Sequence, residues 1–188
     1  MKYIKTYESN FNYKVDVFTI KEASELYRKY YNKYHYKYNL KDKLHYFSYN
    51  DLDSYLSDDK FLETCRLIIA YNDDDILGIC KYAYWRYDGH YAISYCSTNK
   101  DYFNKGISKK LLEETFKNFS KENPNETLYF SGYSVEGWKY LRKSILELAE
   151  KYNVNIFEKG VEYPGLSGKH DDEFYDLMKK SREEVIKK

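Results

Sequence analysis

A short polar segment between a predicted strand and a predicted helix carries the residues best suited to bind an anion. Residues 99–108, with the sequence NKDYFNKGIS, lead directly from the strand that ends at Thr98 into a helix. A tight turn here would leave several backbone N–H groups unpaired at the positive end of the helix dipole, which favours an anion. Gly106 permits close backbone approach, and the small side chain of Ser108 does not block it. The pattern predicts a phosphate site.

Three lysines around this turn add positive charge. Lys105, Lys109 and Lys110 would supply countercharge for a pyrophosphate. A glycine at the start of a basic amphipathic helix is nevertheless common, so an ordinary loop and helix cap remains the alternative on these residues alone.

Hydrophobic periodicity predicts the elements that must position this segment. The first helix begins after Thr19, which has the spacing of a capping box with Glu22, and a later helix has Ser134 as its N-cap. Strands are predicted at 13–18, 66–71, 76–85, 91–98, 127–130 and 154–157, and helices at 20–34, 50–56, 107–119, 138–152 and from 171 onward.

The segment and its setting resemble the acetyl-CoA signature of the GNAT superfamily of N-acetyltransferases, Arg/Gln-x-x-Gly-x-Gly/Ala. The matching residues are Tyr102, Lys105, Gly106, Ile107, Leu111 and Leu112. The order of elements from Tyr13 to Phe157 also matches. The resemblance implies an α/β (α+β) fold with a mixed, mostly antiparallel central sheet, helices on both faces and a splayed strand pair. We expect one domain over 1–188, with a core at about 13–160 and a C-terminal docking helix at about 171–187.

The resemblance implies acetyl-CoA as co-substrate, held by residues of the signature loop. These are Thr98, Phe103, Asn104, Lys105, Gly106, Ile107, Ser108 and Lys109. Phe103 occupies the Arg/Gln position, Asn104 the usual Gly and Ser108 the second Gly/Ala. Backbone amides survive these changes because every non-proline residue has one. The missing Arg/Gln side chain should weaken binding, and it leaves open that the site has decayed.

The family comparison also implies where chemistry would occur. The pantetheine arm would lie between Tyr95–Thr98 and Leu128–Gly132, with the thioester carbonyl on a backbone amide of the signature strand. The family often uses a tyrosine early in the next helix as proton donor. Tyr140 is the corresponding candidate acid, although its order with Leu141 is swapped, and a core tyrosine is an equal alternative.

Glu136, at the start of the same helix, is a candidate base or amine anchor. As a first-turn carboxylate it would also favour the helix dipole, and this structural interpretation is the stronger of the two. His90, beside a predicted turn, is interpreted as a surface residue.

Composition narrows the classes of partner. Lys+Arg total 31 against Asp+Glu 30, so the net charge of +1 creates no field that would hold nucleic acid or an anionic membrane. Three cysteines without a C-x-x-C pair indicate reduced thiols and no metal site, and no apolar run approaches the length of a membrane span. We expect a cytoplasmic protein, monomeric or homodimeric.

The sequence therefore predicts an N-acetyltransferase that transfers an acetyl group to a primary amine of a small molecule or protein. The alternative is a catalytically inactive GNAT-fold module that binds acyl-CoA or a protein partner. An aminoacyl-tRNA acceptor is disfavoured by the balanced charge. The residues do not identify the acceptor, because one fold hosts many substrates.

Overall fold

The computed structural model of the chain describes residues 12–33, 63–86, 88–130, 132–164 and 168–186. The predicted helix at 50–56 lies outside these ranges. The strands are β1 (Lys14–Phe18), β2 (Arg66–Tyr71), β3 (Ile76–Trp85), β4 (His90–Thr98), β5 (Thr127–Phe130), β6 (Tyr133–Ser134), β7 (Asn155–Glu158) and β8 (Val161–Tyr163). The α-helices are α1 (Ile20–Lys33), α5 (Ile107–Glu122), α6 (Arg142–Tyr152) and α7 (Asp172–Ile186).

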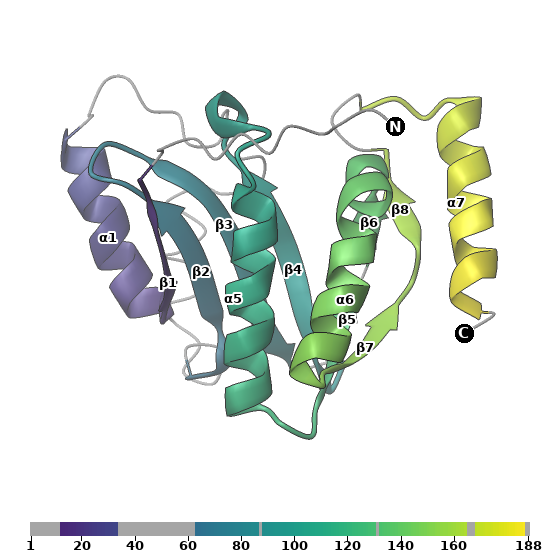
Figure 1. The fold of residues 1–188 in the computed structure, drawn as a ribbon, viewed down its shortest axis with the longest axis horizontal. Coiled ribbons are helices and arrows are strands. Elements are labelled where there is room, and N and C mark those ends of the chain that lie inside the picture. Colours follow the sequence, from purple (N-terminus) through teal and green to yellow (C-terminus); the bar gives the residue numbers. More distant parts are fainter. Residues whose placement is uncertain (1–11, 34–62, 87, 131, 165–167, 187–188) are drawn as a thin grey trace.

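A six-stranded sheet with the order β1-β2-β3-β4-β5-β7 forms the centre of the fold (Figure 1). The first four strands pair antiparallel, whereas β5 is parallel to β4 and β7 is parallel to β5. A second, two-stranded sheet joins β6 to β8. The mixed, mostly antiparallel sheet predicted from the sequence is confirmed.

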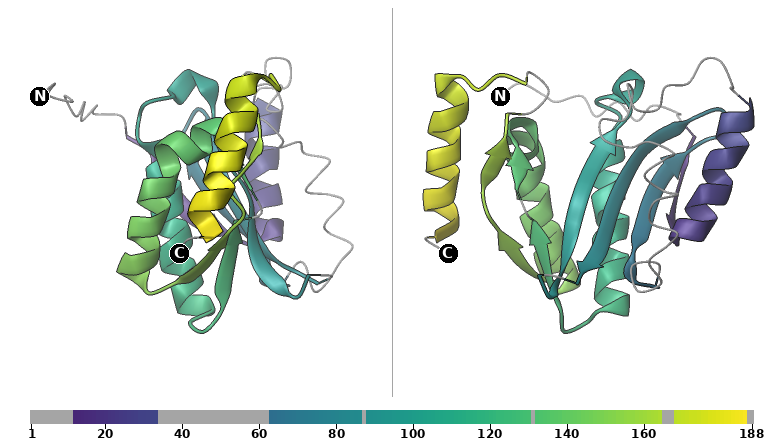
Figure 2. Two further views of the ribbon diagram at one scale, coloured as in Figure 1. Left: turned by 90° about the vertical axis from the view of Figure 1, so that its right-hand side faces the viewer. Right: turned by 180° about the vertical axis from the view of Figure 1, so that it is seen from behind.

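Helices cover both faces of the sheet, and α1 lies on the opposite face from α5 and α6 (Figure 2). The apolar run of β2 explains this layering. Successive side chains of a strand point to opposite faces, and Leu67, Ile68, Ile69 and Ala70 are all fully buried. Leu67 and Ile69 pack with the α1 side, while Ile68 and Ala70 pack with α5 and α6.

The predicted capping box begins α1. The backbone N–H of Thr19 donates to Glu22 Oε2 at 2.8 Å, and the N–H of Glu22 donates to Thr19 Oγ1 at 3.3 Å. These bonds to Thr19 hold the pKa of the Glu22 carboxyl below its usual value. The cap therefore fixes where the chain leaves β1.

The helix predicted at 138–152 begins differently from the expectation. Ser134 Oγ accepts from the N–H of Gly137 at 3.0 Å, as predicted for an N-cap. A π turn then runs from Gly137 to Leu141, in which the N–H of Arg142 donates to the carbonyl of Gly137, and α6 follows. Apolar periodicity does not reveal a single widened turn, because the residues on either side still repeat at helical intervals.

The C-terminal helix α7 packs closely on the corner between β7 and β8. Phe174 is buried, and Ser181 Oγ accepts from the N–H of Val161 at 2.8 Å. Gly160, at φ +91°, lies so near that a Cβ there would come within 2.7 Å of Ser181 Oγ. Among the described residues, no helix combines the length and the apolar character needed to cross a bilayer.

Candidate functional site

The two central strands β4 and β5 part half-way along the sheet. Tyr91–Ile93 pair in parallel with Leu128–Phe130, and β4 then continues to Thr98 while β5 ends. The predicted divergence of Tyr95–Thr98 is present. On the other strand the prediction placed the opening too early, because Leu128 is paired with Tyr91 and the strands separate only after Phe130.

A bulge in β4 coincides with this opening. Lys81 faces Tyr95 and Tyr82 faces Ile93, so Ser94 is an extra residue in β4. A bulge bends a strand and increases its local twist, which moves the remainder of β4 away from its neighbour. Hydrophobic alternation alone does not show it, since the bulge depends on the pairing of two strands.

Backbone polar groups become available where β4 leaves β5. Within the part of the chain that the structure describes, no strand pairs with the β5 side of Ser94–Thr98. Ser94 Oγ is buried there without a hydrogen-bond partner among the same residues. Buried polar groups are normally paired, so this position suits a ligand or an ordered water.

The predicted phosphate loop begins at the end of β4 and turns through two left-handed residues. A 3-10 turn spans Lys100–Tyr102, and Asn104 and Gly106 then have φ values of +63° and +74°. The N–H of Lys110 donates to Gly106, so the three preceding amides come before the first intrahelical bond of α5. Successive N–H groups in such a turn form a concave anion site.

Of the predicted cofactor residues, Phe103, Asn104, Lys105, Gly106 and Lys109 are exposed, Thr98 and Ser108 are half-buried, and Ile107 is buried.

Two of these residues are joined directly. Thr98 Oγ1 and Ser108 Oγ lie 2.6 Å apart in a hydrogen bond. The bond ties the end of β4 to the first turn of α5. Ser108, at the second glycine position of the signature, therefore has a structural partner and is not simply a missing glycine.

Asn99 anchors the loop, although it is not among the site residues predicted from the sequence. It is fully buried, and its Nδ2 donates to the carbonyl of Ile76 at 3.2 Å. Its Oδ1 accepts from the N–H of Asp101 at 3.1 Å, an Asx turn that the pattern Asn-x-Asp after a strand favours. Tyr102 donates its hydroxyl to Asp75 Oδ2 at 3.2 Å. Burial, reinforced by Asp75, raises the pKa of Tyr102 to about 12.

Replacing Asn99 with alanine should destabilise the protein and weaken cofactor binding together, because the loop loses its anchor. We expect the free energy of unfolding, measured in urea, to fall by about 1–3 kcal/mol. Asn125→Ala, in the exposed connection before β5, is the matched control. Equal stability of the two variants would show that the Asn99 side chain does not hold the loop.

The three lysines of the loop differ in their surroundings. Lys110 Nζ lies 3.3 Å from Glu113 and 3.5 Å from Glu114. No acidic partner is seen for Lys105 or Lys109 among the ion pairs of the described residues. Most of the countercharge available to an anion therefore comes from Lys105 and Lys109.

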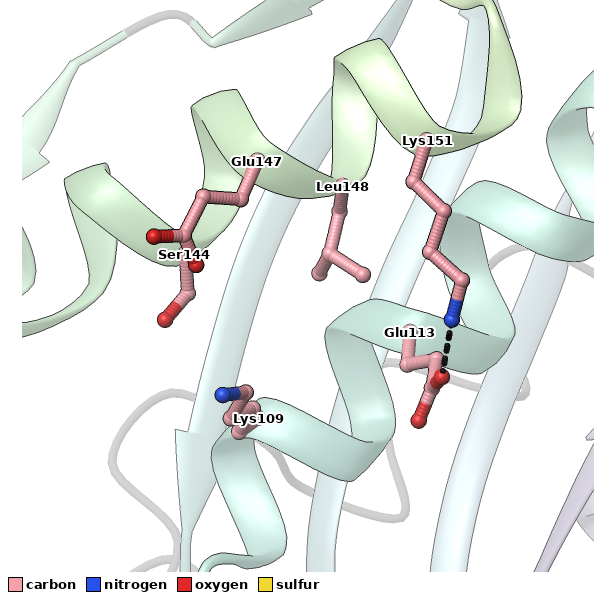
Figure 3. Close-up of a pocket in the computed structure, with 6 residues that line it drawn as sticks. All are labelled: Lys109, Glu113, Ser144, Glu147, Leu148 and Lys151. Carbon is pink, nitrogen blue, oxygen red and sulfur yellow. Dashed lines mark hydrogen bonds and ion pairs between the residues drawn. The ribbon is translucent and has the colours of Figure 1, made fainter.

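Lys109 also lines a groove of about 280 Å³ between α5 and α6 (Figure 3). Ser144 and Leu148 contribute from α6. At one end of the groove, Nζ of Lys151 lies 2.9 Å from Oε1 of Glu113. Glu113 and Glu147 also line the groove, so its two lysines are balanced by two carboxylates.

The candidate acid Tyr140 lies in the π turn and is 74% exposed, so the core-tyrosine alternative is wrong for this residue. The nearby Tyr133 is buried instead, and its hydroxyl donates to Glu158 at 2.8 Å. Glu136 is half-buried just before the π turn. The turn and the start of α5 lie at the same end of the sheet as the end of β4 (Figure 1).

His90 begins β4, at the opposite end of that strand from Thr98, and stacks on Tyr129 with 3.8 Å between ring centroids. It is half-buried and has no place in the candidate site.

An opened mixed sheet and a left-handed turn at the start of α5 are consistent with the resemblance to the GNAT superfamily seen in the sequence. The chain belongs to the acetyltransferase (GNAT) family, whose model matches residues 21–130, more than half of the chain.

The relatives are distant. A 5-aminolevulinate synthase from Rickettsia felis is 32% identical over 82 residues, which are 44% of this chain and 20% of the synthase. This chain thus spans about a fifth of that relative's length. Ribosomal-protein-alanine N-acetyltransferase from Brucella melitensis is a similar structure, 13% identical, covering 74% of this chain and 89% of that one with a TM-score of 0.41. The structure of Escherichia coli ElaA is also similar. It is 13% identical, and the match covers 70% of this chain and 85% of ElaA with a TM-score of 0.48.

Proposed function

We propose that the chain transfers an acetyl group from acetyl-CoA to a primary amine. The observation that carries the proposal is the loop of Asn104 and Gly106 at the start of α5, beside the opening between β4 and β5. The acceptor is a small molecule or a protein, and the proposed location is cytoplasmic.

The loop fits a pyrophosphate. Gly106 has a left-handed backbone, and apart from its chain neighbours no described residue has an atom within 4 Å of the position its Cβ would occupy, so the turn is open to a ligand. The amides of Asn104–Ser108 would hold phosphate oxygens, with Lys105 and Lys109 as countercharge. Phe103 is 42% exposed beside them, where the family signature has a side chain able to donate hydrogen bonds.

Acetyl-CoA supplies an activated acetyl group as a thioester. After the Ser94 bulge, β4 has an edge that none of the described strands pairs with on the β5 side, and its backbone amides would stabilise negative charge on the thioester oxygen. Tyr140 would donate a proton to the departing thiolate, and Glu136 would orient the amine or accept its proton. The carbonyl carbon thereby gains a bond to nitrogen and loses its bond to sulfur.

Two measurements test the proposal. Calorimetry with acetyl-CoA should show one binding event, and release of free thiol should appear with at least one member of a panel of primary amines. Binding without turnover on any amine would favour the alternative of an inactive acyl-CoA-binding module. Absence of binding would overturn both the transferase and the acyl-CoA-binding module, and would favour the protein-interaction alternative.

Salt should weaken CoA binding, because Lys105 and Lys109 are exposed and electrostatic screening acts over a Debye length of about 8 Å at physiological ionic strength. Lys105→Ala and Lys109→Ala should each weaken binding about two- to fivefold. Lys110→Ala is the matched control and should change affinity least, since Glu113 and Glu114 already neutralise that lysine.

Dephospho-CoA should show a shallower salt dependence if one of these lysines reaches the ribose phosphate. Equal salt slopes for CoA and dephospho-CoA would remove the ribose-phosphate contact from the proposal, while an effect of Lys110→Ala equal to the others would contradict the charge assignment.

A further inference from the structure

A charged cluster with a buried carboxylate and a half-buried guanidinium packs next to the π turn. Glu158, at the end of β7, is 5% exposed, and Arg142 binds it with two nitrogens, Nε to Oε1 at 3.1 Å and Nη2 to Oε2 at 3.2 Å. The hydroxyl of Tyr133 donates to the same Oε1 at 2.8 Å. The guanidinium also stacks over the ring of Trp138, 4.1 Å from its centroid. We call Tyr133, Trp138, Arg142 and Glu158 the Arg142 cluster.

The ion pair between Arg142 and Glu158 is favourable only when the two side chains are well aligned. Removing two charges from water costs several kcal/mol per ion, and only a well-aligned pair with further hydrogen bonds offsets that cost. Arg142 meets this condition through its fork geometry, and Glu158 meets it with three donated hydrogen bonds. A small displacement of Arg142 would therefore leave a buried charge poorly paired.

Arg142 contacts the π turn through both its backbone and its side chain. The N–H of Arg142 closes the turn by donating to Gly137, and its side chain clamps Trp138, the second residue of that turn. If the turn had ordinary α geometry, the residues before Arg142 would be rotated by about 100° relative to α6, since each helical residue advances by that angle. The orientation of the preceding residues around the helix axis, including Tyr140, therefore depends on the contacts of Arg142.

Helix α7 reaches the same turn by two ion pairs. Glu184 lies 3.5 Å from Arg142 Nη1, and Glu173 lies 2.8 Å from Nζ of Lys139. Because α7 is fixed to the β7–β8 corner through Ser181, these contacts connect the turn to a packed element. They are partly exposed and so contribute less than the Arg142 cluster.

We propose that Arg142 and Glu158 are positioning residues, which hold the π turn in the geometry that presents Tyr140 to the reacting group, with α7 as the outer support. The inference rests on the proposed function, because Tyr140 has a catalytic role only if the chain carries out the acetyl transfer.

The experiment uses Trp138 as a local probe. The chain has two tryptophans, so Trp85→Phe leaves Trp138 as the only one and provides the background for every variant. Glu158→Gln and Arg142→Lys break the bidentate pair. Glu162→Gln is the matched control, because Glu162 pairs with Arg182 of α7 at 3.1 Å, and among the described residues no hydrogen bond or ion pair joins its side chain to 137–141.

We expect Glu158→Gln and Arg142→Lys to lower kcat about 10- to 100-fold, the cost of a displacement near 1 Å at a reacting group. Acetyl-CoA affinity should stay within about twofold, since the loop at Gly106 is unaffected. The Trp138 emission should shift to longer wavelength as water reaches the ring, and the amides of 137–142 should exchange faster with deuterium. Glu162→Gln should change none of these.

Wild-type kcat with unchanged Trp138 emission in both variants would overturn the inference, as would a loss of stability with turnover per folded molecule intact. If Glu158→Gln does not fold, Arg142→Lys, which keeps the charge, decides. If the wild-type chain turns over no amine, the proposed function fails by itself. Trp138 emission and deuterium exchange then decide whether the Arg142 cluster holds the turn.

Discussion

Acetyl-CoA binding should be lost when Gly106 is replaced by proline. Gly106 has a φ of +74°, whereas the proline ring fixes φ near −65°, so the loop cannot keep its left-handed turn. We expect Kd to rise at least about 100-fold, equivalent to about 2.7 kcal/mol. Isothermal titration with acetyl-CoA measures this change, and circular dichroism reports whether the variant is folded.

Gly106→Asn is the matched control. Asparagine adopts positive φ more readily than most residues with a side chain, and apart from the chain neighbours the added Cβ would meet no atom of the described residues within 4 Å. This variant should retain most of the affinity. A folded Gly106→Pro protein with wild-type affinity would show that the loop is not the cofactor site.

The second large effect is expected at Tyr140, because an exposed phenol in the π turn can donate a proton without supporting the core. An ordinary phenol keeps its proton at neutral pH, and general acid catalysis contributes about 10²- to 10⁴-fold in rate. Tyr140→Phe should lower kcat by a factor in that range. Acetyl-CoA affinity and thermal stability should hardly change, because the side chain is 74% exposed.

Tyr163→Phe provides the comparison, since Tyr163 is 55% exposed on β8 and has no proposed role. Turnover of Tyr140→Phe at the wild-type rate would exclude Tyr140 as the acid. A bound water would then be the better candidate, because the hydroxyl of Tyr133 is already committed to Glu158.

Local sequence patterns were sufficient for much of the fold. The alternating and continuous apolar runs indicated the strands, and Thr19 with Glu22 indicated the start of α1, because each signal depends on neighbours within a few residues. The phosphate loop was recognisable for the same reason, since Gly106 directly precedes a strongly amphipathic helix. The pairing of Lys110 with Glu113 and Glu114 also follows their i+3 and i+4 spacing.

Features that depend on distant partners were not predictable from one sequence. The bulge at Ser94 exists only relative to β3, and the burial of Asn99 depends on the β2–β3 turn that supplies Asp75. The pairing proposed to hold the π turn joins Arg142 to Glu158, 16 residues further along the chain. Tyr140 lies on the surface, whereas the sequence pattern left a catalytic acid and a core tyrosine as equal alternatives.

The hydroxyl bond between Thr98 and Ser108 makes the two positions evolutionarily interdependent. Restoring the family's glycine at Ser108 would strand the hydroxyl of Thr98 and remove the tie between β4 and α5, so this apparent return to consensus should be deleterious on its own. An apolar residue of similar shape at Thr98 would relieve the penalty. Substitutions at the two sites should therefore show epistasis, and homologues with glycine at the second position should carry a different residue at the first.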